Sequence, residues 1–147
     1  MVNSKSLKII GNYLAFPLFL AMAAASAHAE VVVIVSAKSD VTSLTAEQTA
    51  RIFLGKTTHF PNGEAAFPID QIESRPVKAE FYSKVAHKNP TQLSAYWAKV
   101  IFTGQGRPPV ELEGNITIRN VVAKNRNAIG YIEKRYVNRS VRIVLQP

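Results

Sequence analysis

Three residues ahead of a predicted helix have side chains that could bind a small anion. Ser74 and Arg75 directly precede Pro76, a residue suited to the first turn of a helix, and Gln71 lies at the start of the same loop. A hydroxyl can donate to an oxyanion, an arginine can donate two parallel hydrogen bonds, and a helix N-terminus adds partial positive charge. The alternative is that Ser74 caps the helix and Arg75 is solvated, because helix starts favour serine in general.

A second polar loop follows the first predicted strand. The apolar run Val31–Val35 is typical of a strand buried on both faces, and Ser36 and Ser43 follow it. Open α/β sheets bind ligands beyond the carboxyl ends of their strands. We therefore predict that Ser36 and Ser43 contribute hydroxyls to the same anion site, although an ordinary polar loop explains them equally well.

Residues that could perform catalysis are scattered along the chain. Cysteine is absent, which excludes disulfides, thiolate metal sites and thiol catalysis. His59 and His87 are far apart in sequence, and no nucleophile elbow or nucleotide loop is present. Glu111 and Glu113 are the one close acidic pair, in a predicted loop and without a partner. We predict a protein that is not an enzyme and that uses no cofactor and no metal.

The N-terminal segment has the three parts of a secretory signal peptide. Lys5 and Lys8 precede an uncharged apolar run over 9–27, which ends in the small-residue site Ala27-His28-Ala29. The alternative is a retained membrane anchor, but Pro17 interrupts the run. We predict a signal peptide over 1–29, cleaved after Ala29, and one exported periplasmic domain over 30–147 without a further membrane span.

The remaining pattern alternates between strands and helices. It predicts strands at 31–35, 67–69, 128–132 and 141–145, and helices at 46–54, from Pro76, from Pro90 and from residue 115 or 117. The interval 104–114 is glycine- and proline-rich and is predicted to be a loop. Interleaved elements in 147 residues favour a single α/β domain with a mixed sheet flanked by helices.

Two longer motifs resemble those of a known family. Ile52–Lys56 reads IFLGK and is followed by Phe60–Gly63, and Gly114-Asn115 precedes Ala128–Glu133, which reads AIGYIE. These segments are similar, in order and spacing, to segments of the periplasmic phosphate-binding proteins of ABC importers, in the type 2 periplasmic-binding-protein-like superfamily. Full-length members have two lobes. The resemblance implies a single lobe of that fold.

The loop that carries phosphate in that family is altered here. Where the family has R-S-x-G-S-G-T, only Ser74 keeps its type, Arg75 replaces a glycine, and Pro76 replaces the threonine and removes an N–H donor. The resemblance implies a solute-binding-like protein that binds phosphate or a related oxyanion weakly if at all. The alternative is a non-catalytic accessory module that docks a membrane transporter or sensor and retains a vestigial anion site.

Basic residues outnumber acidic ones and give a formal net charge of +8. Four of them form a C-terminal cluster: Lys134, Arg135, Arg139 and Arg142. Such a cluster is a solvated face or an attractor of polyanions. Because no nucleic-acid-binding motif accompanies it, we predict no specific nucleic-acid partner.

Overall fold

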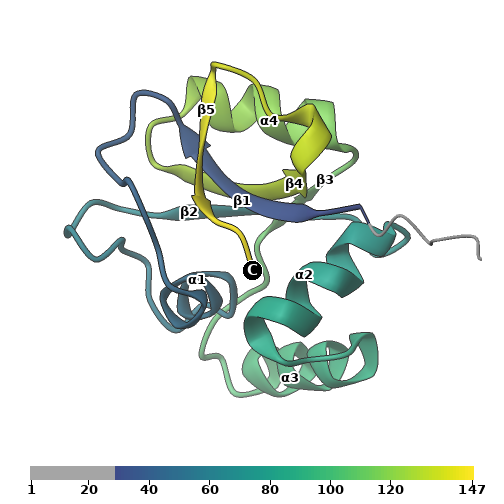
Figure 1. The fold of residues 1–147 in the computed structure, drawn as a ribbon. Coiled ribbons are helices and arrows are strands. Elements are labelled where there is room, and N and C mark those ends of the chain that lie inside the picture. Colours follow the sequence, from purple (N-terminus) through teal and green to yellow (C-terminus); the bar gives the residue numbers. More distant parts are fainter. Residues whose placement is uncertain (1–28) are drawn as a thin grey trace, which may run out of the picture.

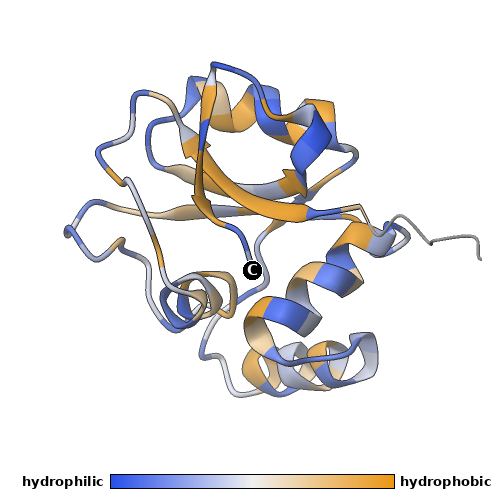
Figure 2. Cartoon of the chain, viewed as in Figure 1, coloured by the Kyte–Doolittle hydropathy of each residue, from blue (hydrophilic) through white to orange (hydrophobic). Residues whose placement is uncertain are grey.

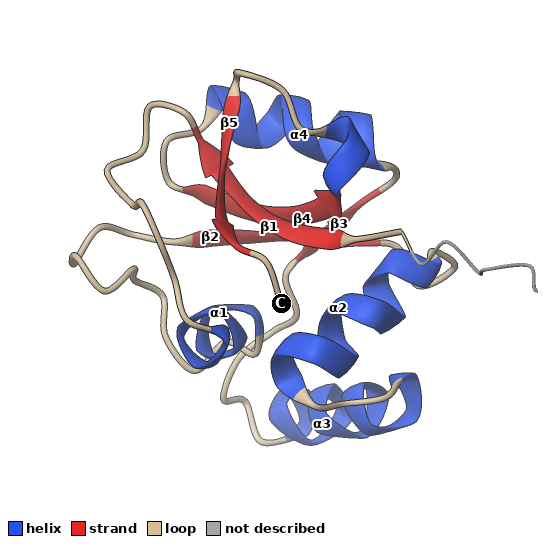
Figure 3. Cartoon of the chain, in the orientation of Figure 1, coloured by secondary structure: helices blue, strands red, loops and turns tan. Residues whose placement is uncertain are grey.

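The computed structural model describes residues 29–147, so the predicted signal peptide lies outside the described residues except for Ala29. A five-stranded sheet is packed between helices (Figures 1 and 3). The elements in chain order are β1 Val31–Ser36, α1 Ala46–Phe53, β2 Phe67–Gln71, α2 Pro76–Ala86, α3 Pro90–Phe102, β3 Val110–Leu112, α4 Asn115–Lys124, β4 Ala128–Glu133, the short 3-10 helix η1 Lys134–Tyr136 and β5 Val141–Leu145.

The sheet is mixed, in the order β3-β2-β4-β1-β5. Strand β2 pairs in parallel with β3 and β4, whereas β1 pairs antiparallel with both β4 and β5. The β1–β4 register places Val31 opposite Glu133 and Val35 opposite Ile129. Strand β1 therefore runs against its four companions. The predicted α/β class with a mixed sheet flanked by helices is confirmed.

Each face of the sheet has its own apolar core. Val31, Val33 and Val35 belong to one core with side chains of α1 and α2, which extends outward to Leu93 and Trp97 of α3, whereas Val32 and Ile34 belong to a second core with α4. All six residues of β1 are buried, because helices cover both faces of this strand. Figure 2 shows β1 as a continuous hydrophobic stretch of the ribbon. The continuous apolar run in the sequence is thus explained by two-sided packing.

Two helices begin with reciprocal side-chain caps. The Thr45 side chain accepts from the Gln48 backbone N–H while the Gln48 side chain accepts from that of Thr45, and Asn89 and Gln92 form the same arrangement. These caps satisfy backbone donors that a helix start leaves free. The predicted helix starts are confirmed at both places.

Leu93, Tyr96, Trp97, Val100 and Ile101 follow the spacing of one helical face on α3, but this apolar stripe is only partly buried. Leu93 and Trp97 are buried, Tyr96 is half-buried with its hydroxyl donating to the Leu54 carbonyl at 2.6 Å, and Ile101 is exposed. The reason is position: α3 contacts α2 but lies outside the layer that covers the sheet. The predicted loop over 104–114 also needs correction, because β3 lies within it, with Val110 opposite Ile69 of β2.

Gly130 lies where β4 meets α4 most closely. A methyl group added at Gly130 would lie 2.8 Å from Ile118 Cγ2 and 3.2 Å from Val122 Cγ2. We expect Gly130→Ala to lower the free energy of unfolding by about 1–3 kcal/mol through overpacking, measured by urea denaturation. Gly106→Ala is the matched control, since its added methyl would meet Val100 at an ordinary 3.5 Å. Equal stability of both variants would contradict this packing.

Candidate functional site

The candidate site is the edge of the sheet at which β2 and β3 end and α2 and α4 begin. We call it the β2–β3 edge and define it by two segments, Asp70–Arg75 and Glu111–Asn115. The two strands are parallel, so their carboxyl ends meet there, and both helices start in the loops that follow. Two helix N-termini supply partial positive charge at this edge. Such an edge is a common place for a ligand in an α/β sheet.

A buried carboxylate occupies the centre of the edge. Asp70 is 2% exposed. Its Oδ1 accepts from the Tyr131 hydroxyl and, at 2.8 Å, from the Gln71 backbone N–H, while its Oδ2 accepts from the Tyr82 hydroxyl at 2.7 Å. Burial raises the pKa of Asp70 above its ordinary value, although these hydrogen bonds and the nearby ammonium of Lys78 oppose the shift. The carboxylate is fully engaged with its own chain.

Lys78, from the first turn of α2, is the cation paired with Asp70. Its Nζ lies 3.7 Å from Asp70 Oδ2, 3.0 Å from Glu73 Oε2 and 2.9 Å from Glu111 Oε1. Burial acts to lower the pKa of Lys78, but the three carboxylates together raise it, so the ammonium stays charged. Burial and the negative charge of Asp70 raise the pKa values of Tyr82 and Tyr131. Their hydroxyls therefore stay protonated and donate to the carboxylate.

Gln71 ties β2 to β4 and α4. It is fully buried, and its Nε2 donates to Asn115 Oδ1 at 3.1 Å and to the Tyr131 carbonyl at 3.2 Å. Asn115 in turn donates to Glu133 and accepts from the Glu133 backbone N–H. Gln71 Oε1 has no protein donor among the described residues. The Gln71 side chain therefore joins β2 to β4 and α4, and its Oε1 is an acceptor that these contacts do not use.

Ser74 and Arg75 lie on the surface of the same edge. Both are exposed, and Arg75 Nη2 donates to Glu113 Oε1 at 3.1 Å. Ser74 does not cap α2, because the N-cap is Arg75 and no side chain caps it. The prediction that Glu111 and Glu113 have no partner is wrong, since Lys78 and Arg75 pair with them. Gln71 lies in the same segment, but its side chain is buried against Asn115 and Tyr131, whereas Ser74 and Arg75 are exposed.

Ser36 and Ser43 lie elsewhere, and the prediction that they join the same site is wrong. Because β1 runs antiparallel to β4, its carboxyl end is at the Ala128 end of the sheet, about 13 Å along the strands from the end that holds Glu133. Ser36 Oγ donates to the Ala123 carbonyl at 3.1 Å and accepts from the Lys38 N–H, while Ser43 is exposed. The direction of a strand decides which loops meet, and the sequence pattern does not reveal it.

The residues that the sequence interpretation missed are Lys78, Tyr82, Tyr131 and Asn115. Lys78 and Tyr82 are four residues apart on one face of α2, and each follows a residue of the apolar series Val77, Phe81 and Val85. A lysine beside an apolar stripe, following an aspartate at the end of a strand, is the signal that could have found the pair. The Tyr131 ring stacks on Phe81 with centroids 3.9 Å apart, and its hydroxyl donates to Asp70.

The cationic C-terminal cluster is largely engaged within the fold. Lys134 pairs with Glu30, Arg135 pairs with Glu133, and Arg142 donates to backbone carbonyls of Ala37, Ser39 and Val41. Within residues 29–147, no group of acidic, histidine or cysteine side chains has the geometry of a metal site. In that same range, no helix is both long and apolar enough to cross a membrane.

Solved structures share this architecture. A phosphate ABC transporter substrate-binding protein of Clostridium perfringens with bound phosphate matches 78% of this chain with a TM-score of 0.61 and 22% identity, and an ABC-type phosphate transport receptor of Vibrio cholerae matches with a TM-score of 0.60 and 19% identity. PstS from Borrelia burgdorferi matches with a TM-score of 0.59 and 14% identity. The chain has the fold of a single-lobe phosphate-binding-protein-like domain.

The lobe spans less than half the length of these neighbours. The matched region covers 44% of the Clostridium protein, 45% of the Vibrio protein and 46% of the Borrelia protein. No protein-family model and no curated protein sequence matches the chain. The likeness therefore establishes the fold of the lobe alone.

Proposed function

We propose that the lobe is an exported, non-catalytic accessory module of a transport or sensing system, with a vestigial anion site at the β2–β3 edge. The observation that carries this proposal is the Asp70–Lys78 pair. A buried aspartate with three hydrogen-bond donors and an ammonium group occupies the centre of the edge. An anion arriving there would meet donors already committed to the carboxylate.

The charge around the edge supports the same proposal. Five carboxylates gather there, and three cations pair with them. The carboxylates are Asp70, Glu73, Glu111, Glu113 and Glu133, and the cations are Arg75, Lys78 and Arg135. The excess of negative charge repels an oxyanion, and the partial charges of two helix N-termini offset only part of it.

Exposed apolar residues favour action through a protein partner. Phe102 is 92% exposed and follows Ile101, which is also exposed, at the end of α3. Phe67 and Val110 are exposed at the starts of β2 and β3, where they line a groove of about 290 Å³. Exposed apolar patches commonly mark interaction sites. We place the partner at the membrane, as a transporter or sensor, and the lobe in the periplasm after removal of residues 1–29.

A second candidate function is weak binding of phosphate or another small oxyanion. The Ser74 hydroxyl and the starts of α2 and α4 favour it, and the Clostridium neighbour contains bound phosphate. In this reading Arg75 would release Glu113 and donate to the anion instead. One open lobe would bury little of such a ligand, so its affinity would be low.

Calorimetric titration with phosphate, sulfate and acetate separates the two functions. We expect no binding heat at millimolar concentration, and we expect Arg75→Ala to change the free energy of unfolding by less than about 0.5 kcal/mol, since its ion pair is exposed. Arg107→Ala, at another exposed loop arginine, is the matched control. Phosphate binding that Arg75→Ala weakens by about one to two decades, and Arg107→Ala leaves intact, would establish the second function.

A photo-crosslinking residue in place of Phe102 tests the accessory function directly. In intact cells it should trap a membrane transport or sensor component, whereas the same residue in place of Lys124, exposed on α4, should not. If both positions trap nothing, docking at this surface is wrong.

A further inference from the structure

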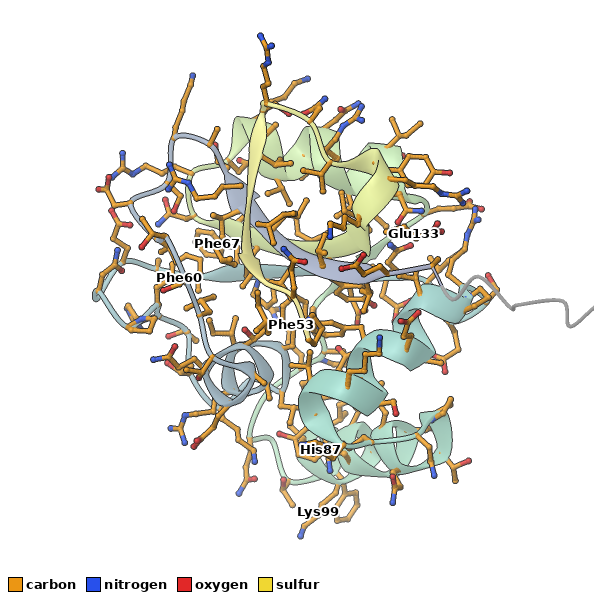
Figure 4. All side chains as sticks on the ribbon, viewed as in Figure 1. Phe53, Phe60, Phe67, His87, Lys99 and Glu133 are labelled. Atoms are coloured by element: carbon orange, nitrogen blue, oxygen red, sulfur yellow. The ribbon has the colours of Figure 1, made fainter. Side chains whose placement is uncertain are left out.

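A groove far from the β2–β3 edge has the opposite electrostatic character. It lies between α1 and the C-terminal end of α2 and has a volume of about 360 Å³. Helix α2 begins at the acidic edge and ends at this groove, about 16 Å away along its axis. Figure 4 labels Glu133 near the edge and His87 near the groove, well apart in the molecule.

The floor of the groove is apolar. Ala46 and Ala50 lie four residues apart on α1, Leu54 follows at the same interval as the C-cap residue, and Val85 and Ala86 line the same groove from the last turn of α2. The volume lies within the range of sites that bind small molecules, and such sites are usually lined by apolar side chains with a few polar groups. This floor can hold a short aliphatic or aromatic body.

The rim of the groove is cationic. Arg51, Lys56 and Lys88 line it with His87, and Glu47 is the acidic residue among its lining side chains. No ion pair within residues 29–147 involves Arg51, Lys56 or Lys88. Lys88 Nζ lies 5.3 Å from the centre of the Tyr96 ring, which holds this ammonium beside the groove.

Cations at helix C-termini can serve merely to balance the helix dipole. Here, three carbonyl groups near the ends of α1 and α2 accept hydrogen bonds from groups other than these cationic side chains. The Arg51 carbonyl accepts from the Lys56 and Thr57 N–H groups, the Leu54 carbonyl from the Tyr96 hydroxyl, and the Tyr82 carbonyl from the Lys88 N–H. Two helix C-termini of about half a negative charge each, together with Glu47, still leave the three cations in excess by about one charge. An anion in the groove would therefore displace no ion pair of Arg51, Lys56 or Lys88 among residues 29–147.

We propose that this groove binds a small amphiphilic anion, with a phosphate or carboxylate group held by Arg51, Lys56 and Lys88 and an apolar body against Ala50 and Leu54. The lining matches both parts of such a ligand, because it combines apolar side chains from α1 and α2 with three cations that have no ion-pair partner among the described residues. The anion-attracting surface of this lobe is then the groove, while the β2–β3 edge repels anions. This inference does not depend on the proposed docking of a partner through Phe102 and Ile101.

Titration with hexyl phosphate tests the groove, with inorganic phosphate and hexanol as probes of its two parts. Hexyl phosphate should bind at least ten-fold more tightly than either part, because each part makes only some of the contacts. The double variant Arg51→Gln/Lys56→Gln should weaken its binding at least ten-fold. Lys38→Gln/Lys124→Gln, which removes the same charge at two exposed positions elsewhere, should leave it unchanged.

Ala50→Leu provides the complementary variant, because it fills the floor, keeps the charge and suits a helix. This variant should weaken the binding of hexyl phosphate at least ten-fold. Its amide chemical shifts away from α1 and α2 should match those of the parent, which would show that the fold is intact. Absence of hexyl phosphate binding at millimolar concentration, or binding that the groove variants leave intact, would overturn the proposal. Binding that responds to Arg75→Ala instead would assign the ligand to the β2–β3 edge and would overturn it equally.

Discussion

Lys78→Met is expected to lower the free energy of unfolding by about 3–5 kcal/mol, the usual cost of removing one partner of a buried ion pair. The substitution keeps the length and the apolar stem of the side chain but leaves Asp70 buried without its counter-ion. Two tyrosine hydroxyls and one backbone N–H remain on the carboxylate, but none of them carries a formal charge. Urea denaturation followed by circular dichroism measures the loss.

Lys84→Met, in the same helix, is the matched control. Lys84 pairs with Glu80 at 2.7 Å near the surface, and such a pair contributes about 0.3–0.5 kcal/mol. Adding Asp70→Asn to Lys78→Met should recover part of the loss, because the buried charge is then gone. If Lys78→Met were no more harmful than Lys84→Met, the assignment of Asp70 and Lys78 as a structural pair would fail.

Phe81→Ala should cost about 3–5 kcal/mol of unfolding free energy, because it removes the centre of an aromatic cluster. Phe81 is fully buried and stacks on Tyr131 with ring centroids 3.9 Å apart. Phe53 of α1 meets it edge-on at 4.7 Å and Tyr82 at 5.0 Å. One ring therefore joins α1, α2 and the sheet, and its loss leaves a cavity that these rigid neighbours fill poorly.

Phe102→Ala makes the same chemical change at an exposed position. Its side chain is 92% exposed at the last residue of α3, so the free energy of unfolding should stay within about 0.5 kcal/mol of the parent. Comparable losses for Phe81→Ala and Phe102→Ala in thermal denaturation would contradict the burial pattern described above.

Much of the fold could be predicted because its signals are local. The run Val31–Val35 is apolar at every position, and the Thr45–Gln48 and Asn89–Gln92 pairs carry the pattern of a capping box. Strand β3 could not be predicted in this way. Its three residues lie among glycines and prolines, and their extended conformation comes from pairing with β2, which is about 40 residues earlier in the chain.

The candidate site was only partly predictable, because its organisation depends on contacts between distant segments. Gln71, Ser74 and Arg75 share one segment, but burial separates the Gln71 side chain from the two exposed ones. Ser36 was assigned to the wrong edge because the antiparallel course of β1 leaves no trace in its composition. The pairing of Asp70 with Tyr131 spans 61 residues, and no spacing rule for a single helix or strand reaches that far.

The central position of β1 makes the order of synthesis matter for folding. This strand leaves the ribosome first among the described elements, yet its two partners, β4 and β5, begin at residues 128 and 141. Until they are made, five consecutive β-branched apolar residues stay unpaired, the composition that favours intermolecular β-aggregation. Closing such distant pairs also slows folding. We therefore expect truncation before Val141, which removes one of the two partners of β1, to yield insoluble protein rather than a smaller lobe.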